Sequence, residues 1–239
     1  LTLPTPTAKT TMFWQESPQQ QTSLDVSDLV DLVFKISGQT LPIDHAYALF
    51  NALAQSLPWI QHDKWVGIHH VHIAESGNGW VRPDDNGFLQ LSGRARLVVR
   101  LHQDTLESAR ILCGTKIVVK DEIIEIGPAR MRPLNPLSTV FARHIVAHED
   151  IRDETKFLQW VTEQLGVLGI TPNKLLCGKT RLIRTPTRTL RTRSLMIADL
   201  KHDESLSIQQ YGLGEGRKLG CGLFMPHRGI DAVYDSTST

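Results

Sequence analysis

The sequence has few features of secreted, membrane-spanning or low-complexity proteins. Its only cysteines, Cys113, Cys177 and Cys221, form no CxxC pattern, which argues against a disulfide framework or a thiolate zinc site. No apolar run approaches the roughly 18 residues of a membrane-spanning helix, and the N-terminus lacks the charged and apolar regions of a signal peptide. The 17 glycines and 12 prolines are too few for a collagen-like chain. We therefore expect an intracellular globular protein.

The chain also has almost no net charge. Its 26 Lys and Arg residues against 25 Asp and Glu leave a balance of +1, which by itself gives no indication of a nucleic-acid partner. The sum conceals an uneven distribution, because acidic residues are frequent near the N-terminus, at Asp25, Asp28 and Asp31, whereas arginines gather in the second half. The 41% of hydrophobic residues is enough to bury a core.

Secondary-structure signals follow the order strand, helix, strand, strand, helix, strand, twice over. In the first half we expect strands at 29–36, 65–74, 88–101 and 116–126, and helices at 44–57 and 104–112, the first with Asp44 as N-cap. In the second half we expect strands at 140–146, 174–183, 190–200 and 219–225, and helices at 153–168 and 204–211. Each set is a ferredoxin-like βαββαβ unit, so the sequence predicts an α+β fold of two tandem ferredoxin-like (RRM-like) units.

Segments without periodicity bound these units. Residues 1–24, rich in Thr, Pro, Ser and Gln, are expected to form a disordered tail. We expect the first unit at 25–127, a Pro-rich linker at 128–139, the second unit at 140–230, and a further tail at 231–239. A turn is expected at Gly77–Gly79.

The stretch 179–193 is the most basic part of the sequence. It contains six cations and no acidic residue: Lys179, Arg181, Arg184, Arg188, Arg191 and Arg193. Arginine contacts phosphate through two parallel hydrogen bonds and stacks on exposed bases, which favours RNA as the ligand. The run has no aromatic residue, so stacking on Phe or Tyr is not expected there. The alternative is a solvated hairpin whose arginines pair with carboxylates elsewhere.

The Gly-rich loop, residues 212–222, is a second candidate for phosphate binding. Closely spaced glycines let backbone N–H groups approach a phosphate, and Arg217 and Lys218 add two cations. The loop lacks the GK[ST] ending of a P-loop, and it follows a helix and precedes a strand, the reverse of a dinucleotide fingerprint. The alternative is a flexible turn without a ligand.

Ten histidines are present, five of them between His45 and His72. On an expected strand, alternation puts His70 and His72 on one face and His69 on the other. The neighbouring acidic residues show no ligand spacing, so no metal site is expected. His45, at the expected start of a helix, is favoured as neutral imidazole by the positive helix end, and neutral imidazole is a competent general base. A structural role is the alternative for each histidine.

Together these features resemble the RAMP superfamily of CRISPR-associated proteins, specifically the repeat-processing endoribonucleases of the Cas-six family, including its MYXAN-type branch. The resemblance spans 30–226 and rests on VDLVFKISG at 30–38, LPIDHAYAL at 41–49, GIH at 67–69, RARL at 94–97, and the Gly-rich loop followed by Leu223 and Phe224. It implies a cytoplasmic prokaryotic enzyme that cuts CRISPR precursor RNA within the repeat hairpin, without a metal or other cofactor. The 2′-hydroxyl attacks the adjacent phosphorus, leaving 2′,3′-cyclic phosphate and 5′-hydroxyl ends. The product would stay bound as guide RNA among other subunits of a Cascade-like interference complex.

The resemblance also implies roles for individual residues. His45 matches the family's active histidine at the helix start and is the first candidate for general base, with His62, in the loop after the helix, as its rival. His69 would be an acid or second base, Tyr47 would orient the 2′-hydroxyl, and Lys64 would stabilise charge. RNA binding falls to Arg94, Arg96, Lys179, Arg181, Arg184, Arg188, Arg191, Arg193, Gly214, Gly216, Arg217 and Lys218.

Two alternatives differ in function class. One is a catalytically inactive RAMP-fold subunit that only binds guide RNA. The other is a double RRM-like single-strand binder, which usually displays stacking aromatics on its central strands. Here 30–36 offers only Phe34, and 140–146 only Phe141.

Overall fold

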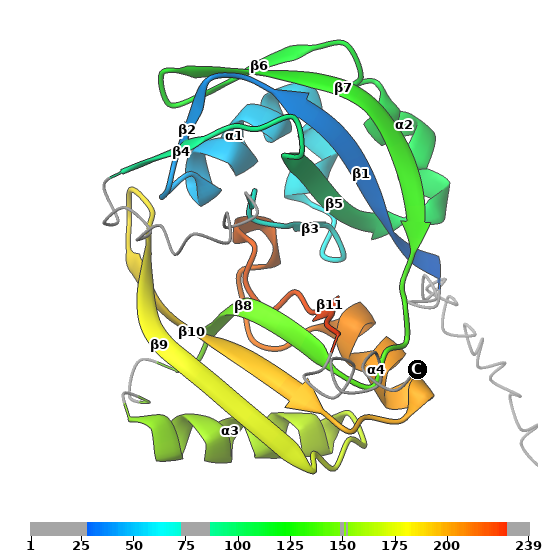
Figure 1. The fold of residues 1–239 in the computed structure, drawn as a ribbon, viewed down its shortest axis with the longest axis vertical. Helices are drawn as coiled ribbons and strands as arrows, with labels where there is room; N and C mark the ends of the chain where they lie inside the picture. Colours follow the sequence, from blue (N-terminus) through cyan, green and yellow to red (C-terminus); the bar gives the residue numbers. More distant parts are fainter. Residues whose placement is uncertain (1–27, 73–86, 149–150, 152, 229–239) are drawn as a thin grey trace, which may run out of the picture.

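Two β-sheets, each with helices packed on one face, lie one above the other along the long axis of the molecule (Figure 1). The computed structural model describes residues 28–72, 87–148, 151 and 153–228. The expected tails and the Gly77–Gly79 turn lie outside these ranges.

The first unit is a five-stranded antiparallel sheet with added short elements. Its elements are β1 (Leu29–Ser37), β2 (Thr40–Pro42), α1 (Ala46–Ser56), the 3-10 helix η2 (Pro58–Gln61), β3 (Gly67–Ile68), β4 (Phe88–Gln90), β5 (Arg96–His102), η3 (Gln103–Thr105), α2 (Leu106–Arg110), β6 (Lys116–Val119) and β7 (Glu122–Pro133). The sheet order is β3-β5-β1-β7-β6, while β2 pairs with β4 alone. Because β5 lies between β1 and β3, the helix α1 connects strands that are not neighbours, as in a split βαβ unit.

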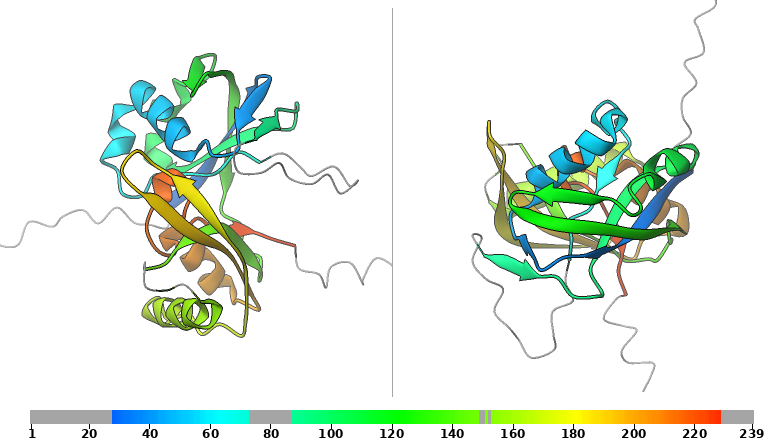
Figure 2. Two further views of the ribbon diagram at one scale, coloured as in Figure 1. Left: turned by 90° about the vertical axis from the view of Figure 1, so that its left-hand side faces the viewer. Right: turned by 90° about the horizontal axis from the view of Figure 1, so that it is seen from above.

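The second unit repeats this topology. Its elements are β8 (Val140–Val146), α3 (Glu154–Val167), β9 (Lys174–Arg184), β10 (Thr189–Ala198), α4 (His202–Tyr211), η4 (Arg217–Leu219) and β11 (Met225–Pro226). The order β11-β8-β10-β9 matches β7-β1-β5-β3 of the first unit. The predicted pair of ferredoxin-like units is thus confirmed, and Figure 2 shows the β9–β10 hairpin reaching from the second unit up beside α1.

Alternation along the strands produces the two cores. In β1, Val30, Leu32 and Phe34 pack with Leu49 and Leu53 of α1, as the period of two in a strand and the period of 3.6 in a helix require. The second core joins Val140, Ala142 and Ile145 of β8 to α3, through Phe157, Val161 and Leu165, and to Ile208 of α4. Burying each large apolar side chain contributes about 1.5–3 kcal/mol.

The start of the first helix differs from the sequence prediction. His45, not Asp44, holds the N-cap position of α1, and its side chain makes no capping hydrogen bond. The Asp44 carboxylate instead accepts a hydrogen bond from the Arg184 backbone N–H and lies 3.5 Å from the Arg184 guanidinium. The residue expected to cap the helix therefore ties it to the β9–β10 hairpin.

Other boundaries also differ. The described part of the strand expected at 65–74 is reduced to β3, and the strand expected at 88–101 is divided into β4 and β5. The expected Pro-rich linker is partly strand, because β7 continues through Gly127 and pairs with β1 as far as Pro133. Since β6 pairs only with residues 122–125, the rest of β7 is an edge strand, where a proline interrupts no second ladder. The last expected strand shrinks to Met225–Pro226, because η4 and left-handed glycines occupy the segment before it.

Candidate active site

The Gly-rich loop is closed at its base by one arginine from the first unit. Arg100 is fully buried, and its Nη1 donates to the carbonyls of Gln209, at 2.7 Å, and Phe224, at 2.9 Å, which flank the loop. Its Nε donates to Asp31 at 2.8 Å, and Arg132 bonds the other Asp31 oxygen at 2.9 Å. Burial opposes the charge on Asp31, but Arg100 overcomes this and holds the pKa of the carboxyl well below its usual value. Composition and motifs gave no sign of this cluster.

Inside the loop, Arg217 is used by the protein itself. Its guanidinium donates to the carbonyls of Tyr211, at 2.9 Å, and Trp65, at 3.2 Å, and burial lowers its pKa to about 10. This arrangement argues against the phosphate-binding role predicted for Arg217. Its hydrogen bonds instead fasten the loop to the segment that precedes β3.

The loop also presses closely on β3 and the histidines that follow it. Gly220 has a positive φ of 76°, and a Cβ there would lie 2.3 Å from the ring of His70. The His70 Nε2 donates to the Leu219 carbonyl at 2.9 Å. Glycine at 220 is therefore required by close packing against His70.

One exposed histidine lies where this loop meets the segment after α1. His62 follows η2 directly and its side chain is exposed. Lys218, from the Gly-rich loop, donates to the carbonyl of the preceding residue, Gln61. Lys64 is also exposed, and its Nζ lies 4.9 Å from the centre of the Trp65 ring. The seam thus combines an accessible imidazole with two ammonium groups, drawn from segments about 150 residues apart in the sequence.

The site predicted around His45 has a different character. His45 is only 1% exposed; its Nδ1 donates to the Pro42 carbonyl at 2.8 Å, and its Nε2 accepts from the Val71 N–H at 3.1 Å. These bonds fix a neutral tautomer with both ring nitrogens engaged. Such an environment argues against the predicted general-base role, which needs an accessible lone pair.

The other histidines nearby form a largely buried stack between the two units, in which His70 is half-buried. The ring of His70 lies 4.3 Å from that of His144 in β8 and 5.2 Å from that of His45. Burial, then the neighbouring His144, lowers the pKa of His70 well below its usual value. His69 lies 3.8 Å from Asp31, and burial together with Arg100 lowers its pKa to about 3. His69 is thus a buried neutral group beside the Asp31 cluster, an unfavourable position for the predicted acid.

The remaining candidates of the first unit lie apart from this seam. Tyr47 is half-buried on the first turn of α1, at the opposite end of the helix from the segment carrying His62. Arg94 is exposed in the turn before β5, and Arg96 donates to the carbonyls of Gly93 and Ala95. The structure does not bring these three side chains together.

The basic stretch forms the β9–β10 hairpin, and its cations divide between two faces. Arg193 lies over the Phe157 ring of α3, at 6.0 Å, and by alternation Arg191 shares that face. Arg181 is paired in register with Thr192, whose hydroxyl contacts His144 on the face toward the first unit. Two cations near the tip are ion-paired, Arg184 with Asp44 and Arg188 with Glu215. Lys179 is exposed on β9, and Gly214 is exposed in the Gly-rich loop, whereas Gly216 is half-buried.

Neither a metal cluster nor a membrane span is found in the described part of the chain. No three His, Cys, Asp or Glu side chains in it are grouped so that they could hold a metal ion. None of its helices is long and apolar enough to cross a membrane.

Comparison with known proteins accounts for this architecture. The family model described as "Cas6 Crispr" matches residues 30–229. The chain belongs to the Cas6 family. It is 27% identical over 197 residues to the "CRISPR-associated endonuclease Cas6" of Myxococcus xanthus (strain DK1622). The aligned residues cover 82% of this chain and 81% of that protein. The resemblance inferred from the sequence is therefore confirmed.

Solved structures support the Cas6 fold. A "CRISPR associated protein Cas6" superposes with a TM-score of 0.59 at 13% identity, covering 84% of this chain and all of the other. "An RAMP protein binding different RNA substrates" gives 0.58 at 12% identity over 83% of this chain and all of the other. At this level of identity the likeness establishes the shared fold, the RAMP architecture of two ferredoxin-like units.

Proposed function

We propose that this Cas6-family protein is an endoribonuclease that cuts CRISPR precursor RNA within the repeat hairpin, with His62 as its general base. The observation that carries the proposal is the seam at the Gly-rich loop. There His62 is exposed, while Lys64 and Lys218 supply positive charge beside it. The relative from Myxococcus xanthus is named an endonuclease, which supports the same activity here.

The β9–β10 hairpin provides the binding surface in this proposal. Arg191 and Lys179 are exposed along it, Arg184 is paired with the largely buried Asp44, and Arg188 forms an ion pair with Glu215 in which both side chains are half exposed. An exposed pair such as Arg188–Glu215 contributes about 0–1 kcal/mol, so a phosphate can replace the carboxylate at small cost. The hairpin lies beside α1 (Figure 2), and the Arg188–Glu215 pair joins it to the Gly-rich loop that carries Lys218.

The chemistry requires only proton transfer and charge stabilisation. His62 takes the proton of the 2′-hydroxyl as its oxygen attacks phosphorus; the P–O5′ bond breaks, leaving a 2′,3′-cyclic phosphate. Lys64 offers positive charge to the phosphorane oxygens. Burial lowers the pKa of Lys218, which makes it a better donor than a solvated lysine for the proton that the 5′-oxygen needs. These groups carry the reaction without a metal ion.

The same proposal includes the fate of the product. The exposed arginines keep the cleaved hairpin bound, and the complex then joins other CRISPR interference subunits in the cytoplasm. A catalytically inactive guide-RNA-binding subunit is the alternative, and a cleavage assay separates the two.

Changing His62 to alanine tests the proposal. Cleavage of labelled repeat RNA in a single turnover should fall by about 10²–10⁴-fold, the usual contribution of a general base, while hairpin affinity changes little. His202→Ala is the matched control, because His202 is an exposed histidine on α4. The parent should remain active in EDTA and yield cyclic phosphate ends. Full cleavage by His62→Ala would reject His62, and absence of cleavage by the parent protein would favour the inactive binder.

A further inference from the structure

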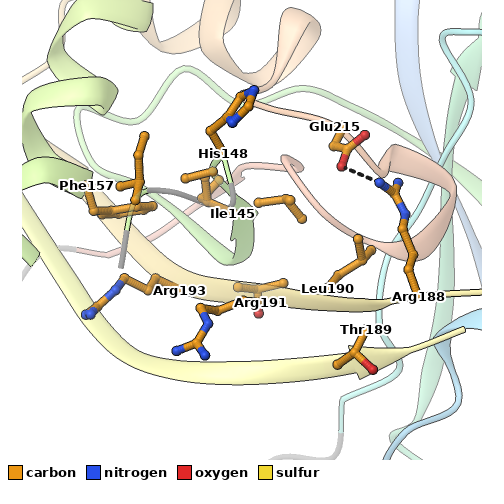
Figure 3. Close-up of a pocket in the computed structure, with 13 residues that line it drawn as sticks. Ile145, His148, Phe157, Arg188, Thr189, Leu190, Arg191, Arg193 and Glu215 are labelled. Atoms are coloured by element: carbon orange, nitrogen blue, oxygen red, sulfur yellow. Dashed lines mark ion pairs between the residues drawn. The ribbon is translucent and has the colours of Figure 1, made fainter. Parts of the chain in front are cut away.

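A pocket of about 360 Å³ opens in the second unit, between β10 and the segment that joins β8 to α3 (Figure 3). Its walls come from the end of β8, the segment leading into α3, the first half of β10, and Glu215 of the Gly-rich loop. The volume is in the range of pockets that hold small ligands, about 300–1,000 Å³.

The pocket exists because the sheet extends beyond the helix that covers it. Ile145 and Arg193 are paired neighbours on the face that α3 covers. The helix begins at Glu154, and Phe157 is its first buried residue, so the sheet around Arg191 is left without a covering helix. Arg191 and Thr189 are exposed there.

The lining combines apolar side chains with cations. Ala147 and Ile151 are its half-buried apolar residues, above the buried Ile145 and Phe157, while Arg188, Arg191 and Arg193 provide the charge. Among the described lining residues, Glu215 is the only acid, and it pairs with Arg188 at 3.1 Å through side chains that are both half exposed. An exposed pair of this kind contributes little, so Arg188 is able to exchange Glu215 for another anion.

We propose that this pocket binds a single unpaired nucleotide of the repeat RNA. Its phosphate lies at Arg188 in place of Glu215, with Arg191 as a further exposed cation. Its base enters against Ala147 and Ile151, beside Arg193, a planar cation on which a base can stack. A planar apolar ring next to a fixed phosphate matches both parts of the lining. The inference rests on the proposed RNA binding and adds to it a site for one base outside the paired stem.

Abasic scanning of the RNA tests this site. The probe is the repeat hairpin with a short single-stranded extension at each end, in which each unpaired nucleotide in turn is replaced by an abasic ribose. Removal of one particular base should weaken binding by roughly tenfold, as expected when a stacked base is lost. The hairpin without extensions should bind the parent protein and the variants below equally well.

Thr189→Trp fills the pocket from an exposed strand position, and Thr189→Ser is its control. In the tryptophan variant, the extended hairpin should bind only as well as the abasic RNA, and removing the base should cause no further loss. The serine variant should keep the parent's tenfold difference. If Thr189→Trp keeps that difference as well, or if no abasic position weakens binding to the parent, the inference is wrong. Failure of the parent to bind even the hairpin stem would instead reject the proposed function.

A second measurement does not depend on how the tryptophan packs. Placing 4-thiouridine at the sensitive position and irradiating the complex should crosslink the RNA to peptides containing 145–148 or 188–193. A crosslink confined to the first unit would contradict the assignment of this pocket.

Discussion

The two ferredoxin-like units share one strand order but use arginine in opposite ways. In the first unit, Arg100 is fully buried and bonds Asp31 together with two carbonyls of the second unit. In the second unit, Arg191 is exposed on a long hairpin, with no hydrogen-bond or ion-pair partner among the described residues. Arginine therefore holds the two units together at position 100, whereas at position 191 it is available to a ligand.

The difference teaches that local charge density is a poor guide to which cations remain available to a ligand. Arg217 lies in the Gly-rich loop, which resembles a phosphate-binding motif, yet its guanidinium donates hydrogen bonds to the carbonyls of Tyr211 and Trp65. What separates the two classes is desolvation, because a buried guanidinium is held by several fixed acceptors whereas an exposed one keeps its donors for a ligand. The first unit thus shapes the Gly-rich loop, and the second offers the exposed charge.

Removing the buried arginine should have the largest effect. Arg100→Ala leaves Asp31 buried with Arg132 as its remaining hydrogen-bonded cation and leaves the carbonyls of Gln209 and Phe224 without their donor. We expect the free energy of unfolding to fall by about 3–5 kcal/mol, as when one partner of a buried pair is deleted. Urea denaturation measures this directly.

Arg191→Ala is the matched control for that experiment. Because Arg191 is exposed, its removal should change the free energy of unfolding by no more than about 0.5 kcal/mol. Equal destabilisation by the two substitutions would contradict the proposed difference, in which Arg100 stabilises the fold and Arg191 is available to a ligand.

Lowering the pH should destabilise the first unit through His69 and His70. The arginines of the β9–β10 hairpin stay charged over the same pH range. The pKa of His69 falls from 6.5 to about 3 in the folded protein, and that of His70 is also lowered, chiefly by burial. The unfolded chain takes up these protons as the pH drops through 6.5 and the folded chain does not, so stability is full above this pH and is lost below it. Each histidine should remove about 1.4 kcal/mol per pH unit.

Between about pH 6 and pH 4.5, the change in the free energy of unfolding should come mainly from the histidines. The stabilisation that Asp31 provides is lost only at lower pH, because its pKa is lowered in the folded protein. Urea denaturation at several pH values gives the slope. His69→Gln should be less stable at pH 7 and should flatten the slope by about one proton. An unchanged slope would show that His69 is not the group that resists protonation.

The sequence was sufficient for the fold because periodicity is a local property. The strand at 140–146 is found with the predicted bounds, and the helix expected at 153–168 forms α3 with Asp153 as its cap. The site was harder to predict because it depends on contacts across the chain. Nothing near His45 in sequence shows that Val71 would occupy its Nε2, and nothing near Gln61 shows that Lys218 would reach its carbonyl. His62 was recognised only as a rival to His45, and exposure is what now favours it.

The smallest expected effect concerns the exposed arginines and is seen best in its dependence on salt. Each phosphate contact releases counterions from the RNA, so losing one contact should reduce the slope of log affinity against log salt by about 0.7–0.9. Replacing Arg188 and Arg191 together should therefore lower the affinity for the repeat RNA hairpin. It should also reduce the slope by roughly the amount expected for two phosphate contacts. Lys174→Ala is the control, because Lys174 is an exposed cation at the far end of β9, paired with Asp199. If the double variant and the Lys174 control show the parent's slope alike, the hairpin arginines lie off the RNA path, and the contrast between the two units is one of burial alone.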